Sequence, residues 1–273
     1  MKKILFLGAG SKADPPFNSI IDKKYFNDKG ISVVDTAIES CHSCYDLMSR
    51  YSRELQSFVE NGHRVVGVLE GGLLFALPSI QATQTTYPII SCPFDLVSYQ
   101  AFMVPSGNGV VGSVGIDRKS GDIYESNERR KAILTAENIL NLDESAVAIR
   151  TKQNMKSEIQ KELERLAITT EKNSKLILNF NCQPSVVRGE EIQIWADPRE
   201  NLFNGSYLEC AERTISGVSN TVQVRGKSNL VIYAAKILSL NRADLREKLK
   251  NMGEEKRKSY PERDLIQELG SGD

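Results

Sequence analysis

The stretch KILFLGAGSKADP, residues 3–15, decides the fold class. Residues 3–8 form a short apolar run that ends at a glycine, which predicts a buried strand. Gly8 and Gly10 allow the backbone to turn sharply and to approach a ligand closely. Asp14 suits a helix N-cap and Pro15 suits a first helical turn. A strand, a glycine turn and a helix in this order predict an alternating α/β chain.

The residues that follow continue this alternation. Further short, β-branched runs predict strands at 31–36, 64–69, 88–92 and 110–116. Apolar residues spaced 3.6 apart predict a helix from Tyr45 to Glu60. We therefore expect an α/β fold, a flavodoxin-like three-layer sandwich with a parallel sheet, whose ligands bind beyond the carboxyl ends of the strands.

The later part of the chain predicts a second, partial α/β repeat. Residues 128–165 are highly charged and helix-like, 171–175 suggest a linker, and strands are expected at 175–180, 191–196 and 220–224, before a helix at about 227–251. We divide the chain into a first domain, 1–170, and a partial repeat, 171–273. The segments Ala136–Leu142 and Ala234–Leu240 resemble each other. Two unrelated amphipathic helices or a partial duplication would each explain that resemblance.

Composition excludes several classes of protein. The 273 residues contain 35 Lys+Arg and 35 Asp+Glu, so the net charge of zero argues against a polyanion-binding surface and against nucleic-acid binding. No stretch of 18 apolar residues predicts a membrane span. Met1–Leu7 is too short an apolar run for a signal peptide. Five scattered cysteines fit reduced thiols in a cytoplasmic protein, and a lone Cys41-x-x-Cys44 pair predicts no metal site.

The first glycine turn is a candidate phosphate site. Free backbone N–H groups at Gly10, with the Ser11 hydroxyl, would hold a phosphate at the start of a helix, near Asp14. The same residues fit a loose dinucleotide fingerprint, in which Asp35 would hold a ribose. A tight turn with a helix cap and no ligand is the third interpretation.

Three more candidate positions follow the later strands. Ser40, His42 and Ser43 come after the second strand, and the His42 imidazole is suited to proton transfer near neutral pH. Gly71 and Gly72 after the third strand would let the backbone pack against a flat ligand. The fourth position is Ser106, in a Pro-Ser-Gly loop before the fifth strand. A structural histidine and simple turns are the alternative interpretations.

Together these motifs resemble the aminoimidazole ribonucleotide (AIR) carboxylase/mutase family of purine biosynthesis. The matching elements are Gly10-Ser11-Lys12-Ala13-Asp14, Ser40-Cys41-His42-Ser43, the glycine turn at 71–72, the strand Pro88–Pro93, the loop Val104–Gly107 and the helices Ala136–Leu142 and Ala234–Leu240. Order and spacing match from residue 3 to about 165 and partly again from about 175 to 255.

The resemblance implies a lyase-type carboxylation, or a carboxylate transfer, on a phosphoribosyl-aminoimidazole substrate, with CO2 as the carbon source in one branch of the family. Ser11 and Ser43 would contact phosphate or carboxylate, Asp14 the ribose, and Gly71-Gly72 the imidazole. His42 would be the general acid/base. No cofactor is implied, because the ring carbon is already nucleophilic. The family forms octamers, so a homo-oligomer is expected, with the second half of this chain standing in for a neighbouring subunit.

Several positions depart from the family pattern. Ala13 replaces a loop serine, Ser43 replaces a basic residue, and the glycine turn continues as Leu73-Leu74-Phe75 without a polar side chain. A diverged ribotide-binding protein without turnover is therefore one alternative. A Rossmann-type NAD-dependent oxidoreductase is another, weakened by Pro15-Pro16 and by the absence of a third glycine.

Overall fold

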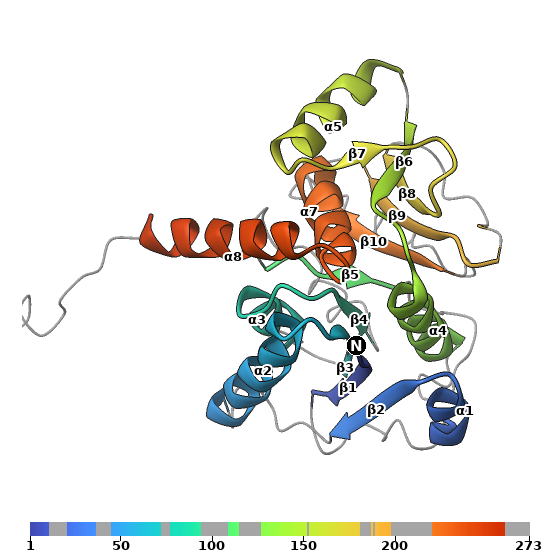
Figure 1. Ribbon diagram of the computed structural model, residues 1–273, viewed down its shortest axis with the longest axis vertical. Helices are drawn as coiled ribbons and strands as arrows, with labels where there is room; N and C mark the ends of the chain where they lie inside the picture. Colours follow the sequence, from blue (N-terminus) through green and yellow to red (C-terminus); the bar gives the residue numbers. More distant parts are fainter. Residues whose placement is uncertain are drawn as a thin grey trace, which may run out of the picture.

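The chain folds as an α/β protein with a mostly parallel central sheet flanked by helices, as Figure 1 shows. This computed structural model describes residues 1–10, 21–36, 45–71, 77–93, 109–114, 127–151, 153–180, 187, 189–197 and 220–259. The flavodoxin-like fold class expected from the sequence is confirmed.

The central strands are buried along almost their whole length. β1 (Lys3–Ala9), β3 (Arg64–Gly71) and β4 (Ile89–Pro93) are apolar on both faces, as strands between two helix layers must be. Their side chains supply much of the core, including Leu5, Leu7 and Val66, which are fully buried. The continuous apolar runs in the sequence therefore marked these strands correctly.

The first half of the sheet has the strand order β2-β1-β3-β4-β5, with β2 at Ile31–Thr36 and β5 at Gly112–Ser113. Its neighbouring strands are all parallel. This is the order of flavodoxin-like sheets, in which the chain reverses its direction of travel between β1 and β3.

The second half repeats this order. β6 (Ala146–Thr151), β7 (Thr169–Thr170), β8 (Leu176–Phe180), β9 (Ile192–Asp197) and β10 (Thr221–Arg225) lie in the order β7-β6-β8-β9-β10. The two halves join where β10 pairs antiparallel with β5, with Gln223 opposite Ser113. Strand order thus groups β6 and β7, which fall within the predicted first domain, with the strands of the second half.

Helices cover the first half-sheet on both sides. α2 (Tyr45–Glu60) and α3 (Leu77–Thr83) lie on one side, and α1 (Lys23–Asp28) and α4 (Asn127–Asn141) on the other (Figure 1). α4 packs against β1, β3 and β4. The first half is therefore a complete three-layer unit.

In the second half, α5 (Gln153–Arg165) and α8 (Ala243–Lys258) pack against a central helix, α7 (Gly226–Leu238). α7 is buried on nearly all sides, as expected for a helix with apolar residues around its whole circumference. Tyr233 donates a hydrogen bond to the Ile89 carbonyl at 3.1 Å. A Cβ atom at Gly112 would lie only 2.6 Å from the Tyr233 ring. α7 therefore ties the second half to β4 and β5 of the first.

Three sequence predictions need correction. The predicted helical region 128–165 contains strand β6 between α4 and α5, and the predicted helix at 227–251 is divided into α7 and α8 at residues 239–242. Of the strand predicted at 110–116, the described residues 110–114 contain only the two-residue strand Gly112–Ser113. β6 was missed because its β-branched run is short, lies between charged segments and is too brief for a repeat of apolar residues to be recognised. Within the part of the chain that the structure describes, no helix has the length and apolarity needed to cross a bilayer.

Candidate functional site

In sheets of this strand order, the connections from β1 and β3 leave in opposite directions, and ligands bind in a crevice outside the carboxyl ends of the strands. We therefore take this position, called the β1/β3 crevice, as the candidate site. Ala9 at the end of β1 is in register with Glu70 at the end of β3. The Gly10 amide donates to the Glu70 carbonyl oxygen at 2.8 Å. Gly10, which follows β1, is therefore hydrogen-bonded to the end of β3.

The structure brings two of the predicted site residues together. Gly10 directly follows Ala9 and Gly71 directly follows Glu70, so both glycines flank the crevice. Gly71 is buried and in register with Pro93 of β4. The remaining predicted residues lie outside the described part of the chain: Ser11, Asp14, Ser40, His42, Ser43, Gly72 and Ser106. In the sequence, they follow the carboxyl ends of β1, β2, β3 and β4.

An ion pair that the sequence analysis missed lies beside this crevice. Arg129 Nε and Nη2 of α4 donate to the two carboxylate oxygens of Glu70, at 2.6 and 2.9 Å. The two side chains are 1% and 0% exposed. Removing one partner of such a pair typically costs about 3–5 kcal/mol, because the other charge is left buried and uncompensated. Glu70, an isolated acid in an otherwise apolar strand, was the signal that a cation must lie nearby.

Two further titratable groups, Glu128 and Cys92, neighbour the Glu70–Arg129 ion pair. Glu128, next to Arg129, accepts from Lys131 Nζ at 2.6 Å and is nearly buried in the first turn of α4. Cys92 lies in register with Glu70. Burial raises the pKa of the Cys92 thiol well above its usual value, and the Glu70 charge adds to this effect. Cys92 is therefore protonated near neutral pH and is poorly suited to act as a nucleophile.

A row of polar side chains crosses the junction of the two half-sheets at the same level. Ser91, Ser113 and Gln223 occupy successive register positions on β4, β5 and β10, and all three are buried. Ser113 Oγ lies 3.1 Å from the Val114 carbonyl oxygen. Polar side chains therefore extend from β4 across β5 into the second half.

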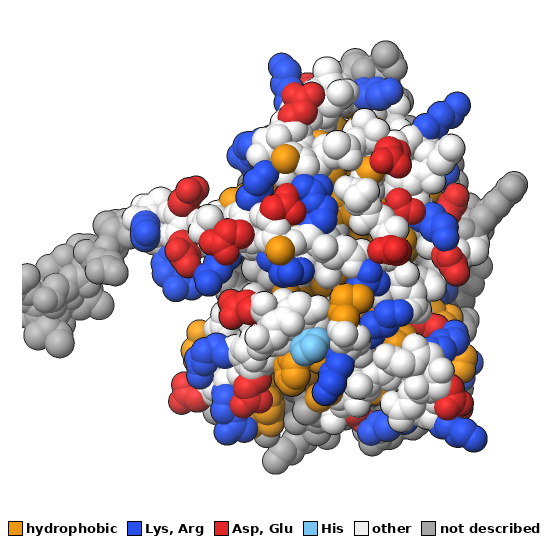
Figure 2. All heavy atoms as spheres, viewed as in Figure 1, with side chains coloured by type: hydrophobic (Ala, Val, Ile, Leu, Met, Phe, Trp, Pro, Cys, Tyr) orange, Lys and Arg blue, Asp and Glu red, His pale blue; other side chains and the backbone are white. Residues whose placement is uncertain are grey.

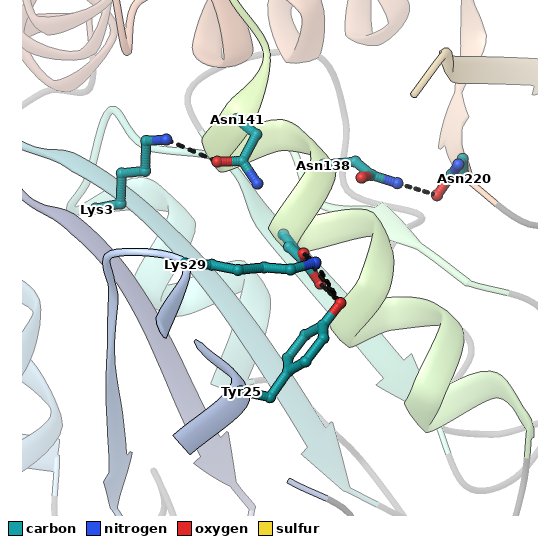
Figure 3. A network of polar contacts seen from close by, with 7 residues as sticks. Lys3, Tyr25, Lys29, Asn138, Asn141 and Asn220 are labelled. Atoms are coloured by element: carbon teal, nitrogen blue, oxygen red, sulfur yellow. Dashed lines mark hydrogen bonds and ion pairs between the residues drawn. The ribbon is translucent and has the colours of Figure 1, made fainter. Parts of the chain in front are cut away.

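A second polar network lies at the other end of α4, around a hollow of about 390 Å³. Lys29 and Tyr25 converge on Glu137 of α4, Lys3 donates to Asn141, and Asn138 donates to Asn220 (Figure 3). The charged groups here are largely paired with one another, as in Lys29–Glu137 and Lys175–Glu190. We therefore interpret this network as a structural link between the halves.

The charges on one face of the molecule are mixed in sign. Figure 2 shows basic and acidic side chains interspersed over the face in view. Within the described ranges, no group of three or more His, Cys, Asp or Glu side chains is placed to hold a metal ion.

Comparison with known proteins adds no further constraint. The chain matches no protein-family model, and a search of curated proteins gives no significant sequence match.

Proposed function

We propose that this protein binds a phosphorylated aminoimidazole riboside at the β1/β3 crevice and carboxylates its ring, or transfers a carboxylate to it. The observation that carries the proposal is the hydrogen bond from Gly10 to the end of β3, which places Gly10 and Gly71 near each other at the switch point of a flavodoxin-like sheet. Backbone amides at such a position can hold a phosphate, and glycines there let a flat ring approach the backbone closely.

The proposed chemistry needs positioning and one proton transfer. The nucleophilic ring carbon attacks the carbon of CO2, a carbon–carbon bond forms, and a CO2 oxygen takes the displaced electron pair as a carboxylate. The same ring carbon then gives its proton to a base, and the aromatic ring is restored. The family resemblance implies that this base is His42, that Ser11 and Ser43 contact the phosphate or carboxylate, and that Asp14 contacts the ribose. Ser40 and Ser106 would be further substrate-binding residues. Proton transfer by a positioned imidazole contributes about 10²–10⁴-fold.

The two histidines of the chain provide a matched test. We would measure carboxylation of AIR by the full chain and by His42→Asn and His63→Asn variants. His63 accepts a hydrogen bond from the Lys2 amide at 3.1 Å, just before β3 begins, so it lies away from the carboxyl ends of the strands. We expect about 100-fold or greater loss of kcat in His42→Asn and unchanged turnover in His63→Asn.

Three outcomes would count against this assignment. Equal turnover in wild type and His42→Asn would remove His42 from its role. Tight ribotide binding with no turnover in the wild type would support a diverged binding protein instead. Tight binding of NAD without ribotide binding would favour the oxidoreductase alternative.

A further inference from the structure

We propose that Arg129, acting through Glu70, is a positioning residue that fixes Gly10 and Gly71 at the mouth of the crevice. The ligand in this inference is that of the proposed function, on which this part rests. The effect of Arg129 on the position of Gly10 can be tested without any ligand. Neither Arg129 nor Glu70 is expected to contact the substrate through its side chain.

The first link is the ion pair itself. The Arg129 guanidinium holds both carboxylate oxygens of Glu70 in a two-point contact, which fixes the direction of the carboxylate as well as its distance. Arg129 lies in the first turn of α4, and α4 packs against β1, β3 and β4. The end of β3 is thus held by a helix anchored on three strands.

The second link is made by the backbone of Glu70. Its carbonyl oxygen accepts the Gly10 amide, and its peptide bond leads directly into Gly71. Glu70 therefore connects α4 to both Gly10 and Gly71. A shift of Glu70 toward solvent would move the Gly10 amide and the Gly71 backbone together.

The burial of the pair makes such a shift the expected response to its loss. With Arg129 shortened to Met, the buried Glu70 carboxylate would lose its two-point ion pair, so the end of β3 would be held less firmly and its movement toward water at the sheet edge would cost less. Replacing both residues, as in Glu70→Leu with Arg129→Met, removes the buried charge and should let the strand end return to its place.

Amide hydrogen exchange in the full chain tests whether Arg129 holds Gly10 in place. We expect the Gly10 amide to exchange at least tenfold faster in Arg129→Met than in wild type, and the double variant to recover most of the protection. Lys29→Met is the matched control, since it removes a cation from the nearly buried Glu137 at the far end of α4. It should leave Gly10 exchange unchanged. Amides of β8 report whether global unfolding has increased.

If Arg129→Met does not fold, Arg129→Lys keeps the charge but cannot make the two-point contact, and it should still speed Gly10 exchange severalfold. Unchanged Gly10 exchange in the folded variants would overturn the positioning role. Exchange that is equally fast in Lys29→Met would do so too.

Ligand affinity separates this inference from the proposed function. Titration with AIR should show Kd raised tenfold or more in Arg129→Met, near the wild-type value in the double variant, and unchanged in Lys29→Met. Failure of the wild type to bind AIR would overturn the proposed function, while Gly10 exchange would still decide the role of Arg129. Wild-type affinity in Arg129→Met would overturn the positioning role alone.

Discussion

Lys236 is a lysine buried in the central helix α7. It is 1% exposed, and its Nζ donates to the carbonyl oxygens of Ala82 and Thr85, at 3.2 Å each, where α3 ends. Burial lowers the pKa of this amine to about 7. A neutral amine has two hydrogens, which matches the two carbonyl acceptors.

The Lys236 amine predicts a stability that rises with pH. Between about pH 7 and the unfolded pKa of 10.5, the unfolded chain binds the proton that the folded chain has lost, so folding becomes more favourable as pH increases. The limiting slope is about 1.4 kcal/mol per pH unit. Burial also raises the pKa values of Cys92, Tyr87 and Tyr233, so the thiol lowers stability near and above pH 9 and the two phenols near and above pH 10. We expect urea unfolding at pH 7.0, 7.5 and 8.0, below these ranges, to show the rise in wild type, and Lys236→Met to flatten it.

Lys250→Met is the control for this experiment. Its ammonium lies 3.8 Å from Glu60 with about half of its side chain exposed, so its removal should leave the pH dependence as it is. A wild-type slope that persists in Lys236→Met would refute the assignment.

Gly112 is the residue whose size the packing limits most clearly. A Cβ atom there would meet the Tyr233 ring at 2.6 Å, whereas a Cβ at Gly67 would meet its neighbours at 3.5 Å, an ordinary contact. We expect Gly112→Ala to destabilise the fold by about 1–3 kcal/mol, as overpacking does. Gly67→Ala should cost clearly less. Chemical denaturation of the two variants compares them directly, and equal costs would show that Tyr233 moves aside easily.

The short helix α1 depends on its N-cap. Asp22 Oδ1 accepts from the amides of Lys24 and Tyr25, at 2.9 and 3.2 Å. Replacing such a cap by Ala costs about 1 kcal/mol. We predict this loss of unfolding free energy for Asp22→Ala in urea titrations. Asp28→Ala, at the other end of α1, is the control, since removing a negative charge at a helix C-terminus is neutral or slightly favourable.

Elements with a clear apolar pattern could be predicted from the sequence, and those held by distant contacts could not. β1, β2, β3, β4 and α2 carry β-branched or periodic runs with clear ends, so their positions were predicted correctly. β6 has only a short run between charged segments. The run at 110–116 indicated a strand around β5, but the two-residue strands β5 and β7 are too short for their bounds to follow from a sequence pattern. They are strands because neighbouring strands supply their hydrogen bonds.

The same limit applies to the candidate site. Gly10 and Gly71 were singled out because glycines at strand ends have a local signature, and the structure places both at the ends of β1 and β3. Their role in binding a ligand stays a prediction. The Glu70–Arg129 pair joins residues 59 positions apart, and no spacing rule connects a strand end to the first turn of a helix that begins so much later. Only the isolated acid in an apolar run indicated that a partner was needed.

The two half-sheets share one hydrophobic core. A single cluster of buried residues includes Leu5 and Val66 from the first half and Leu178 and Leu230 from the second. A core shared in this way should couple the halves, since neither can be exposed without opening the other.

We therefore predict one cooperative unfolding transition for the whole chain. Trp195, the only tryptophan, lies on β9 and reports on the second half. Far-UV circular dichroism reports on the helices of both halves. The two denaturation curves should coincide. A fluorescence transition at a different urea concentration would show that the halves unfold separately.

The contact between Lys236 and the end of α3 has a consequence for chemical labelling. An exposed lysine reacts with acylating reagents at any time, whereas the Lys236 amine is buried and is protected until α7 parts from α3. Its acetylation rate should follow the frequency with which α7 parts from α3. The rate of Lys236 acetylation, followed by mass spectrometry, would therefore measure how often the molecule opens between α7 and α3.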